Sequence, residues 1–320
     1  MADNTPPIIR KADTAAIAEA AKLLRAGGLV AVPTETVYGL AARADSDAAV
    51  AAIYRAKGRP DFNPLIVHVS GVEQAQQLAE VDARARLLAT RLWPGALTLV
   101  LPKRADAPLA AAATAGLPSV ALRCPAHPVM RALLAECGLP LAAPSANRSG
   151  AVSPTSAAHV AASLGGKAAT WAGLILDGGT CAQGIESTIV ALREGGGWQL
   201  LRPGPATEAQ ISAILGVGPD VTTSDAGIEA PGQLASHYAP GKPMRLDATV
   251  AGEGEFHIGF GAVAGDLSLS PSGDLAEAAA RLYAALHEAA AATLPRIAVA
   301  PVPDHGIGAA INDRLRRAAA

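Results

Sequence analysis

Cysteines and long apolar runs are scarce in this chain of 320 residues, and each shortage excludes a class of protein. The three cysteines, Cys124, Cys137 and Cys181, form no CxxC pair, so we expect no zinc site and predict free, partly buried thiols. Such sparse use of cysteine is typical of a reducing cytoplasm, which is the predicted location. No run of about 18 apolar residues occurs, and residues 1–13 lack the apolar centre of a signal peptide, so no membrane span is expected.

Aromatic residues are also scarce, and the chain has no excess of basic charge. Aromatics make up 3% of the chain, so the core must be built from Ala, Leu, Val and Ile. A formal net charge of −2 and a pI near 6.4 lack the basic footprint of a general nucleic-acid binder, and any anion site must be local. Half of the residues are hydrophobic and 17% are charged, which indicates a globular protein. The length favours two domains.

Residues 1–215 are predicted to form an α/β domain with a mixed sheet. Apolar segments of strand length alternate with helical patterns, and several lie close enough in sequence for antiparallel pairing. Helices are expected over residues 14–26, 46–56, 72–92, 127–136 and 207–215, with Thr14 and Ser46 as N-caps. Strands are expected over residues 29–32, 65–69, 97–101, 120–123, 141–143, 174–177, 187–192 and 198–201.

Residues 216–243 are rich in Gly, Pro and Ser, show little periodicity, and are the predicted linker. A linker of this length is often a functional lid. From Met244 the pattern restarts, with strands expected over residues 256–260 and 297–300 and helices over 274–292 and 309–319. This alternation predicts a small parallel α/β domain over residues 244–320, whose last helix exposes Asn312, Arg314, Arg316 and Arg317.

The stretch from Val32 to Val69 carries the strongest functional signal. A buried strand runs into the polar turn Pro33–Thr36, and further on Lys57 and Arg59 flank Gly58. Glycine lets the backbone approach a ligand, and the two cations can neutralise a polyphosphate. The same tripeptide also fits a helix C-terminus, with Gly58 as its cap and basic residues complementing the helix dipole. Taken alone, it leaves both interpretations open.

Other polar side chains follow predicted strands. Arg123 can hold a carboxylate through two parallel hydrogen bonds, although a surface salt bridge is the plain alternative. Ser145 and Asn147 can donate to phosphate or ribose oxygens, or can simply form a turn. His68 lies inside a strand, where a lone histidine is more often a core residue than a catalyst. No GxxxxGK[ST] motif occurs, so any ATP site uses another cradle.

Taken together, six motifs resemble one family, the threonylcarbamoyl-AMP synthases of the Sua5/YrdC group in their two-domain Sua5 form. The motifs are PTETVYGL (33–40), AKGRPDFNPLIVH (56–68), APSANRSGAVSPT (143–155), GIESTIV (184–190), LRPG (201–204) and SHYAP (236–240). The resemblance covers nearly the whole chain. It implies a twisted mixed-sheet YrdC-like domain, followed by a smaller Rossmann-like parallel α/β C-terminal domain.

The resemblance also implies an activity. Members of the family make L-threonylcarbamoyl-adenylate from L-threonine, bicarbonate and ATP, releasing pyrophosphate, for the N6-threonylcarbamoyladenosine at position 37 of tRNA. It implies Mg²⁺ bound with ATP, a downstream tRNA threonylcarbamoyl transferase complex, and no strong direct RNA binding. The alternatives are an RNA-binding module, a nucleotide-binding regulator without catalysis, and a carbamoyltransferase of hydrogenase maturation. The last of these carries CxxC zinc repeats that this chain lacks.

Individual roles follow from the matched motifs. Lys57 and Arg59 correspond to the catalytic cations. The threonine-binding residues are Thr36, His68, Arg123 and Ser187. The ATP-binding residues are Lys57, Arg59, Asn63, Ser119, Ala143, Ser145, Asn147, Ser153, Arg202 and Tyr238. One departure concerns the linker, where the family usually has PGM and a basic residue before HYAP, and this chain has Pro231-Gly232-Gln233-Leu234.

Overall fold

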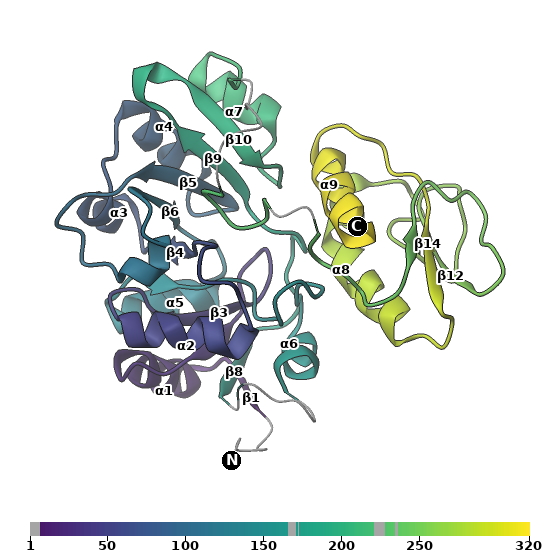
Figure 1. Cartoon of the computed structure of the whole chain (residues 1–320), viewed down its shortest axis with the longest axis horizontal. Helices are drawn as coiled ribbons and strands as arrows, with labels where there is room; N and C mark the ends of the chain where they lie inside the picture. The colour runs from purple at the N-terminus through teal and green to yellow at the C-terminus, as the bar shows by residue number, and fades with distance from the viewer. Residues whose placement is uncertain (1–6, 166–170, 172, 221–227, 234–235) are drawn as a thin grey trace.

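The computed structural model describes residues 7–165, 171, 173–220, 228–233 and 236–320. These residues form a large α/β body and a smaller one that contains the C-terminus (Figure 1). The described part of the large body is built on one mixed sheet of ten strands. From edge to edge the strands are β1 (Ile8–Lys11), β8 (Leu174–Asp177), β2 (Val30–Val32), β3 (Gly39–Arg43), β7 (Leu141–Ala142), β4 (Ile66–His68), β6 (Ser119–Arg123), β5 (Leu97–Pro102), β9 (Thr188–Leu192) and β10 (Trp198–Arg202).

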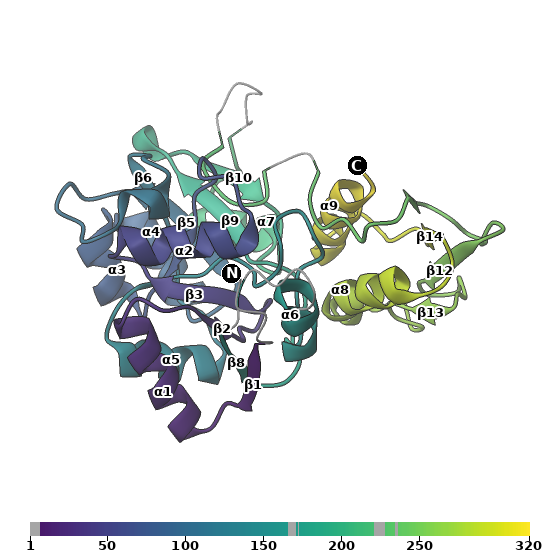
Figure 2. The same ribbon diagram turned by 60° about the horizontal axis from the view of Figure 1, so that its bottom comes forward.

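Helices cover the two faces of this sheet unequally (Figure 2). On one face, α1 (Thr14–Arg25) and α5 (Pro128–Cys137) bury the half of the sheet that contains β8, β2, β3 and β7. The other face is covered by α2 (Asp47–Lys57), α3 (Val72–Leu78), α4 (Ala83–Leu92), α6 (Ala157–Leu164) and α7 (Glu208–Leu215). On the first face, α1 and α5 do not cover the other half of the sheet, which is formed by β4, β6, β5, β9 and β10. There Ala230 of the linker packs against strand residues instead.

The termini of the helices depend on local capping. Ser46 caps α2 as predicted, but the cap of α1 is Asp13, whose carboxylate accepts a hydrogen bond from the amide of Ala16 at 2.8 Å. The prediction of Thr14 as this cap was wrong, because a carboxylate also gains from the positive end of the helix dipole. Gly58 ends α2 in the left-handed conformation at φ 60°. The tripeptide Lys57-Gly58-Arg59 is therefore a helix C-terminus.

Several short elements differ from those predicted from the sequence. The helix expected over residues 72–92 is two helices, because Asp82 caps a new start at α4. The strands β1 and β3 and the helix α6 were not predicted. Strand β3 has the sequence GLAAR, which lacks β-branched and aromatic residues, and its place is decided by antiparallel pairing with β2 and β7.

The C-terminal body contains a second sheet in the order β11-β14-β12-β13, with every described pair parallel, as predicted. Its strands are β11 (Met244–Arg245), β12 (Glu255–Gly259), β13 (Leu267–Ser268) and β14 (Arg296–Val299), and its helices are α8 (Leu275–Ala291) and α9 (Ile307–Ala319). The division of the chain at residues 215 and 243 stays a prediction. No helix among the described residues has the length and apolar character needed to cross a membrane.

One prediction for α9 was wrong. Arg314 was expected to be exposed with its neighbours, but it is completely buried, while Arg316 is exposed. Arg314 lies on the same side of the helix as Ile311 and Ala318, which belong to the core of the C-terminal body. This core also includes Val37 and Ile185 from the large body, so the two bodies share buried apolar contacts.

Candidate functional site

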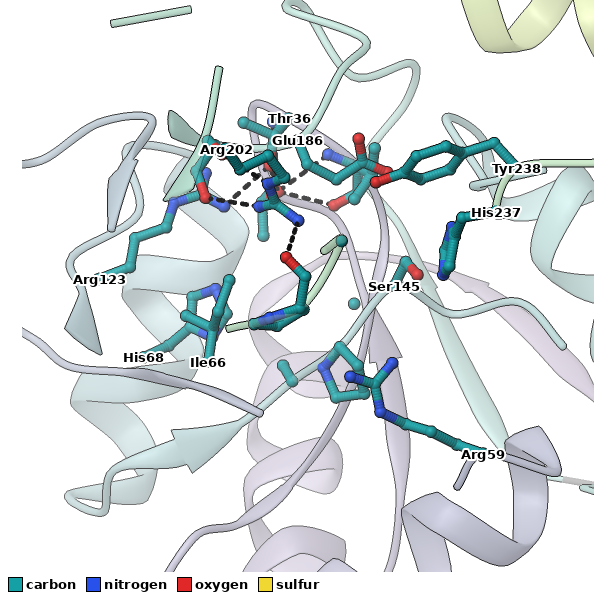
Figure 3. Close-up of a pocket in the computed structure, with 18 residues that line it drawn as sticks. Thr36, Arg59, Ile66, His68, Arg123, Ser145, Glu186, Arg202, His237 and Tyr238 are labelled. Carbon is teal, nitrogen blue, oxygen red and sulfur yellow. Dashed lines mark hydrogen bonds between the residues drawn. The ribbon is translucent and has the colours of Figure 1, made fainter. Parts of the chain in front are cut away.

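A hollow of about 540 Å³, part of it open to solvent, lies on the half of the sheet face that α1 and α5 leave free (Figure 3). Its walls come from strand-end loops of the large body and from the linker residues Pro231, Gly232, His237 and Tyr238. The described parts of the linker thus form one wall of the hollow.

Sheet register brings the first group of side chains together. Strands β4 and β6 are parallel, with His68 directly opposite Arg123 where both strands end. Strand β5 runs antiparallel to β6 and parallel to β9, so the start of β9 reaches the same edge, just after Ser187. Strand β10 returns along β9 and ends there with Arg202. Residues far apart in sequence therefore meet along one edge of the sheet.

Arg123 is buried and already has partners. Its Nη2 donates to a carboxylate oxygen of Glu35 at 2.7 Å and its Nη1 to the hydroxyl of Thr36 at 2.9 Å, while Nε donates to the carbonyl of Gly95 at 3.1 Å. The salt bridge is buried, not a surface pair, and Glu35 could not be identified as its partner from the sequence. Burial raises the pKa of Glu35, but the Arg123 guanidinium more than offsets this and leaves the pKa below its usual value. Each terminal nitrogen of Arg123 has a second N–H that these contacts leave for a ligand.

His68 faces the same hollow and is buried, with no hydrogen-bond partner for its Nδ1 among the described residues. Burial, reinforced by the charge of Arg123, lowers the pKa of His68 to about 3, so the ring is neutral near pH 7. An unpartnered buried nitrogen is costly unless a ligand satisfies it. His68 therefore brings an unpartnered polar atom to the hollow, and its predicted contact with threonine stays a prediction. Its sequence context held no reason to separate it from an ordinary core histidine.

Arg202 and Ser187 form a second unit. The guanidinium donates through Nε to the carbonyl of Ser187 at 3.0 Å and through Nη2 to its hydroxyl at 3.2 Å. The Ser187 hydroxyl also lies 2.7 Å from the hydroxyl of Thr98. Nη1 of Arg202 donates to the carbonyl of Pro231 at 3.3 Å and so joins the linker to the strand end.

Arg59 is the third guanidinium at the hollow. It donates to the carbonyls of Asn63 and Pro64, at 3.3 and 3.0 Å. Within the described ranges, neither Arg59 nor Arg202 forms an ion pair with a carboxylate. Burial lowers the pKa of both, to about 10 for Arg59. Buried cations that form no direct ion pair are stabilised by a bound anion.

Lys57 does not line the hollow. Its Nζ is buried and donates to the carbonyl of Ser145 at 2.5 Å, to the carbonyl of Asn147, and to Oδ1 of Asn147 at 3.4 Å. Burial keeps the pKa of Lys57 well below its usual value. Here the lysine holds the PSAN loop against the end of α2, and its predicted contact with phosphate stays a prediction.

The remaining predicted ATP residues divide between the hollow and its surroundings. Ala143, Ser145 and Tyr238 line it. Behind the wall, Asn147 donates to the carbonyls of Arg148 and Ala151 at 2.9 and 2.7 Å. These contacts stabilise the loop that carries Ser145.

Three further predicted ATP residues do not line the hollow. Ser153 donates to Glu186 at 2.6 Å, and Asn63 has a buried Oδ1 without a partner among the described residues. Ser119 begins β6, about 13 Å along the strand from Arg123, and lines a separate groove with Arg193. Their predicted contacts with ATP remain predictions.

The linker contributes residues that the sequence did not single out. His237 is buried at the hollow, and its Nδ1 has no described partner. The only signal for it was its place beside Tyr238 in the HYAP motif. Gln233, where the family motif departs, accepts hydrogen bonds from the amides of Glu229 and Ala230 at 2.8 and 2.9 Å. It closes a turn in the linker itself, whereas Leu234 lies outside the described residues.

Protein stability should fall on acidification because His68 and His237 are buried and neutral. Burial lowers the pKa of each to about 3. As pH falls through about 6.5, the unfolded chain takes up these protons first, so their stabilising contribution is complete above pH 6.5 and declines below it. At pH 5.5 we expect a loss of about 1.4 kcal/mol per histidine.

Urea denaturation at pH 7.5 and 5.5 measures this effect. His68→Gln should reduce the pH-dependent loss by about 1.4 kcal/mol. His305→Gln alters an exposed histidine and is the matched control, which should leave the wild-type pH dependence unchanged. An identical pH dependence in wild type and His68→Gln contradicts a neutral buried His68.

Buried arginines around a hollow at strand ends are typical of α/β proteins that bind an anionic small molecule. Comparison with known proteins gives the family. The Sua5_yciO_yrdC family, described as telomere recombination, matches residues 22–204, and the Sua5_C family, described as the threonylcarbamoyl-AMP synthase C-terminal domain, matches residues 206–320. The chain belongs to the Sua5/YrdC family and is of the two-domain Sua5 type.

Individual relatives agree with this assignment. A Bacillus subtilis protein named threonylcarbamoyl-AMP synthase is 42% identical over 95% of this chain and 92% of its own length. A protein of the same name from Pyrococcus abyssi is 39% identical over 93% of this chain and 92% of its own. The crystal structure of P. abyssi Sua5 complexed with L-threonine is similar with a TM-score of 0.86 and 37% identity, covering 98% of this chain and 97% of that one.

Proposed function

We propose that this protein synthesises L-threonylcarbamoyl-adenylate from L-threonine, bicarbonate and ATP, with release of pyrophosphate. The observation that carries the proposal is the convergence of Arg59, Arg123 and Arg202 on one hollow, where Arg59 and Arg202 have no carboxylate partner among the described residues. This surplus of buried positive charge suits a triphosphate together with an amino-acid carboxylate. Membership of the family and the names of its relatives support the same reaction.

Each part of the hollow has a role in the proposal. The threonine carboxylate binds the unused N–H groups of Arg123, and its hydroxyl and amine bind near Thr36, His68 and Ser187. Arg59 and Arg202 neutralise the phosphates, and Ser145 and Tyr238 contact the nucleotide. The threonine amine and bicarbonate condense to a carbamate: the N–C bond forms, a C–O bond of bicarbonate breaks, and the hydroxide leaves with an amine proton as water. A carbamate oxygen then attacks the α-phosphorus, and the bond to the β-phosphate breaks with pyrophosphate as the leaving group.

No covalent protein intermediate is required, because alignment and charge neutralisation supply most of the catalysis in phosphoryl and nucleotidyl transfer. The linker wall also fits this chemistry, since a carbamate is short-lived in water and this wall limits the access of water to the hollow. Mg²⁺ enters as part of the ATP substrate. The described residues contain no group of three or more His, Cys, Asp or Glu side chains placed to hold a metal ion, and Glu35 and Glu186 are paired with arginines.

The wider setting is part of the same proposal. The adenylate passes to a tRNA threonylcarbamoyl transferase complex in the cytoplasm, for modification of position 37 of tRNA. An RNA-binding module is not favoured, since the three arginines are buried and the net charge is −2. A nucleotide-binding regulator would need no site for an amino acid beside the phosphate cations.

Pyrophosphate release tests the proposed function. We expect release that depends on threonine, bicarbonate and ATP together and that disappears when any one is withheld. A product with the mass of threonylcarbamoyl-adenylate should accumulate in parallel. Release that is equally fast without threonine, or ATP binding without any release, contradicts the proposal and favours a regulator.

The amino-acid preference should follow the polar lining of the hollow. Thr36, His68 and Ser187 offer hydrogen bonds to a side-chain hydroxyl, and a site built for such a bond discriminates against an analogue that lacks it. Threonine should exceed valine in kcat/KM by at least about tenfold, the worth of roughly one hydrogen bond, with serine between them. Competition of each amino acid in the pyrophosphate assay measures this order. Equal use of valine and threonine contradicts the polar pocket.

A further inference from the structure

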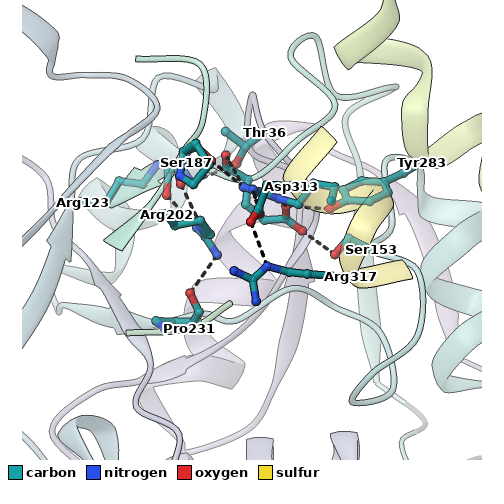
Figure 4. A network of polar contacts seen from close by, with 12 residues as sticks. Thr36, Arg123, Ser153, Ser187, Arg202, Pro231, Tyr283, Asp313 and Arg317 are labelled. Atoms are coloured by element: carbon teal, nitrogen blue, oxygen red, sulfur yellow. Dashed lines mark hydrogen bonds and ion pairs between the residues drawn. The ribbon is translucent and has the colours of Figure 1, made fainter. Parts of the chain in front are cut away.

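Glu186 is a buried carboxylate at the edge of the hollow, and the sequence did not identify it as a site residue. It lies immediately before Ser187 and lines the same hollow as the three arginines. Its Oε1 accepts from Ser153 at 2.6 Å, and its Oε2 accepts from Tyr283 of α8 at 2.7 Å and from Arg314 of α9 at 2.9 Å. These contacts join the C-terminal body to the strand ends at the hollow. Figure 4 shows Tyr283 and Asp313 of that body in one polar network with Ser153, Ser187 and Arg202.

Arg314 makes more contacts than one ion pair requires. Its Nη2 donates to the carbonyl of Pro203 at 3.0 Å and lies 3.5 Å from the carbonyl of Glu186. Pro203 directly follows Arg202, and Glu186 directly precedes Ser187. One guanidinium from the C-terminal body therefore holds the backbone beside two residues that line the hollow.

The linker is bound to the same helix. The Arg314 guanidinium lies 5.6 Å from the centre of the Tyr238 ring, and the amide of His237 donates to the carbonyl of Arg317 at 3.1 Å. Arg314 itself is paired with Asp313 through Nη1 at 2.7 Å. Arg314 thus lies next to both the strand ends and the linker wall.

Charge gives a second reason to consider Arg314. Burial raises the pKa of Glu186, but Arg314 and then Arg202 lower it to about 2, so Glu186 is ionised at neutral pH. A negative charge at the wall of a hollow that binds anions repels the ligand unless a cation neutralises it. Arg314 neutralises the charge of Glu186 without itself lining the hollow. The N–H groups of Arg202 therefore remain available for Ser187, the linker and the ligand.

We infer that Arg314 is a positioning residue of the substrate site, which makes the C-terminal domain an integral part of that site. Arg314 fixes the positions of Ser187 and Arg202 by binding the neighbouring carbonyls of Glu186 and Pro203, and its charge neutralises that of Glu186. This inference rests on the proposed function for the identity of the ligands. A residue that merely joined the two bodies would affect stability but not the KM of the protein that remains folded.

The experiment uses the full-length chain and measures KM for threonine and for ATP in the pyrophosphate assay. Arg314→Met should raise both values by at least about tenfold, since two backbone contacts and the neutralising charge are lost together. Arg314→Lys should give an intermediate rise, because an ammonium can pair with Glu186 but lacks the planar fork that also reaches Pro203. Arg316→Met is the matched control, because Arg316 lies on the same helix with a side chain that is 61% exposed, and its KM values should be those of wild type.

A fourth variant keeps the inference testable if Arg314→Met does not fold. Glu186→Gln combined with Arg314→Met leaves no isolated buried charge, and removal of both members of a buried pair is far better tolerated than removal of one. It should fold and still show a raised KM for threonine, because the carbonyl contacts remain lost. Folded variants of Arg314 with both KM values within about twofold of wild type would falsify the inference.

Binding measurements separate this inference from the proposed function. Calorimetric titration gives dissociation constants for threonine and for ATP without turnover, and these should rise in parallel with KM. Wild-type protein that releases no threonine-dependent pyrophosphate overturns the proposed function alone. Unchanged dissociation constants in folded Arg314 variants overturn the positioning role alone.

Discussion

Replacing Arg123 by methionine should lower kcat/KM for threonine by about 10³-fold, equivalent to about 4 kcal/mol of transition-state stabilisation. The variant loses the cation that we assign to the threonine carboxylate, and a hydrogen bond to a charged group is worth about 1.5–3 kcal/mol. It also leaves Glu35 buried without its partner at 2.7 Å. Breaking a buried pair in this way costs about 3–5 kcal/mol of folding stability. The measurements are steady-state kinetics with varied threonine and urea denaturation.

Two companion variants of Arg123 separate binding from stability. Arg123→Lys keeps a positive charge beside Glu35 and should recover part of the stability, but it lacks the fork and should remain at least about tenfold impaired in kcat/KM. Glu35→Gln combined with Arg123→Met removes both charges and should recover stability without activity. If that double variant regains wild-type kcat/KM, Arg123 acts only on Glu35 and does not bind the substrate.

Much of the fold and part of the site could be predicted from the sequence. Strand-length apolar runs located β4, β6 and β10, and the arginines that end β6 and β10, Arg123 and Arg202, line the hollow in the structure. The local sequence pattern is enough to predict such residues, because a side chain at the end of one of these strands lies at the edge of the sheet where the hollow is. The parallel C-terminal sheet also followed from alternation alone.

Partners across long sequence separations could not be predicted. Glu35 and Arg123 are 88 residues apart, and Glu186 and Arg314 are 128 apart. Such pairs depend on how strands and bodies are arranged, which a single sequence does not state. Arg314 is a different case, because its spacing of three from Ile311 and four from Ala318 placed it on the apolar side of α9. The expected exposure of Arg314 together with Arg316 and Arg317 did not take this spacing into account.

The linker offers a second test with a large expected effect. Gly232 has φ +87°, and a Cβ at this position meets Cδ of Arg202 at 2.8 Å, Nη1 of Arg202 at 3.2 Å and the hydroxyl of Tyr238 at 3.3 Å. Arg202 is buried and held by Ser187 and Pro231, so it cannot move aside without losing hydrogen bonds. Alanine at position 232 therefore displaces a guanidinium that the proposed reaction needs at the phosphates.

Gly232→Ala should reduce the rate of pyrophosphate release by roughly 10²-fold, since a misplacement of about 1 Å in a catalytic geometry has effects of that size. The matched control is Gly241→Ala, also in the linker, with φ +77° and no heavy atom within 4 Å of the added Cβ. Both variants carry the cost of a left-handed alanine, roughly 1–2 kcal/mol, and Gly232→Ala should lose further stability in thermal denaturation because its Cβ displaces the buried Arg202. Gly241→Ala should keep its rate within about twofold of wild type, because its strain does not reach Arg202. Equal rates in the two variants mean that backbone strain alone explains the effect, and the linker then has no part in setting Arg202. A loss confined to Gly232→Ala assigns the defect to the contact between the linker and the arginine at the end of β10.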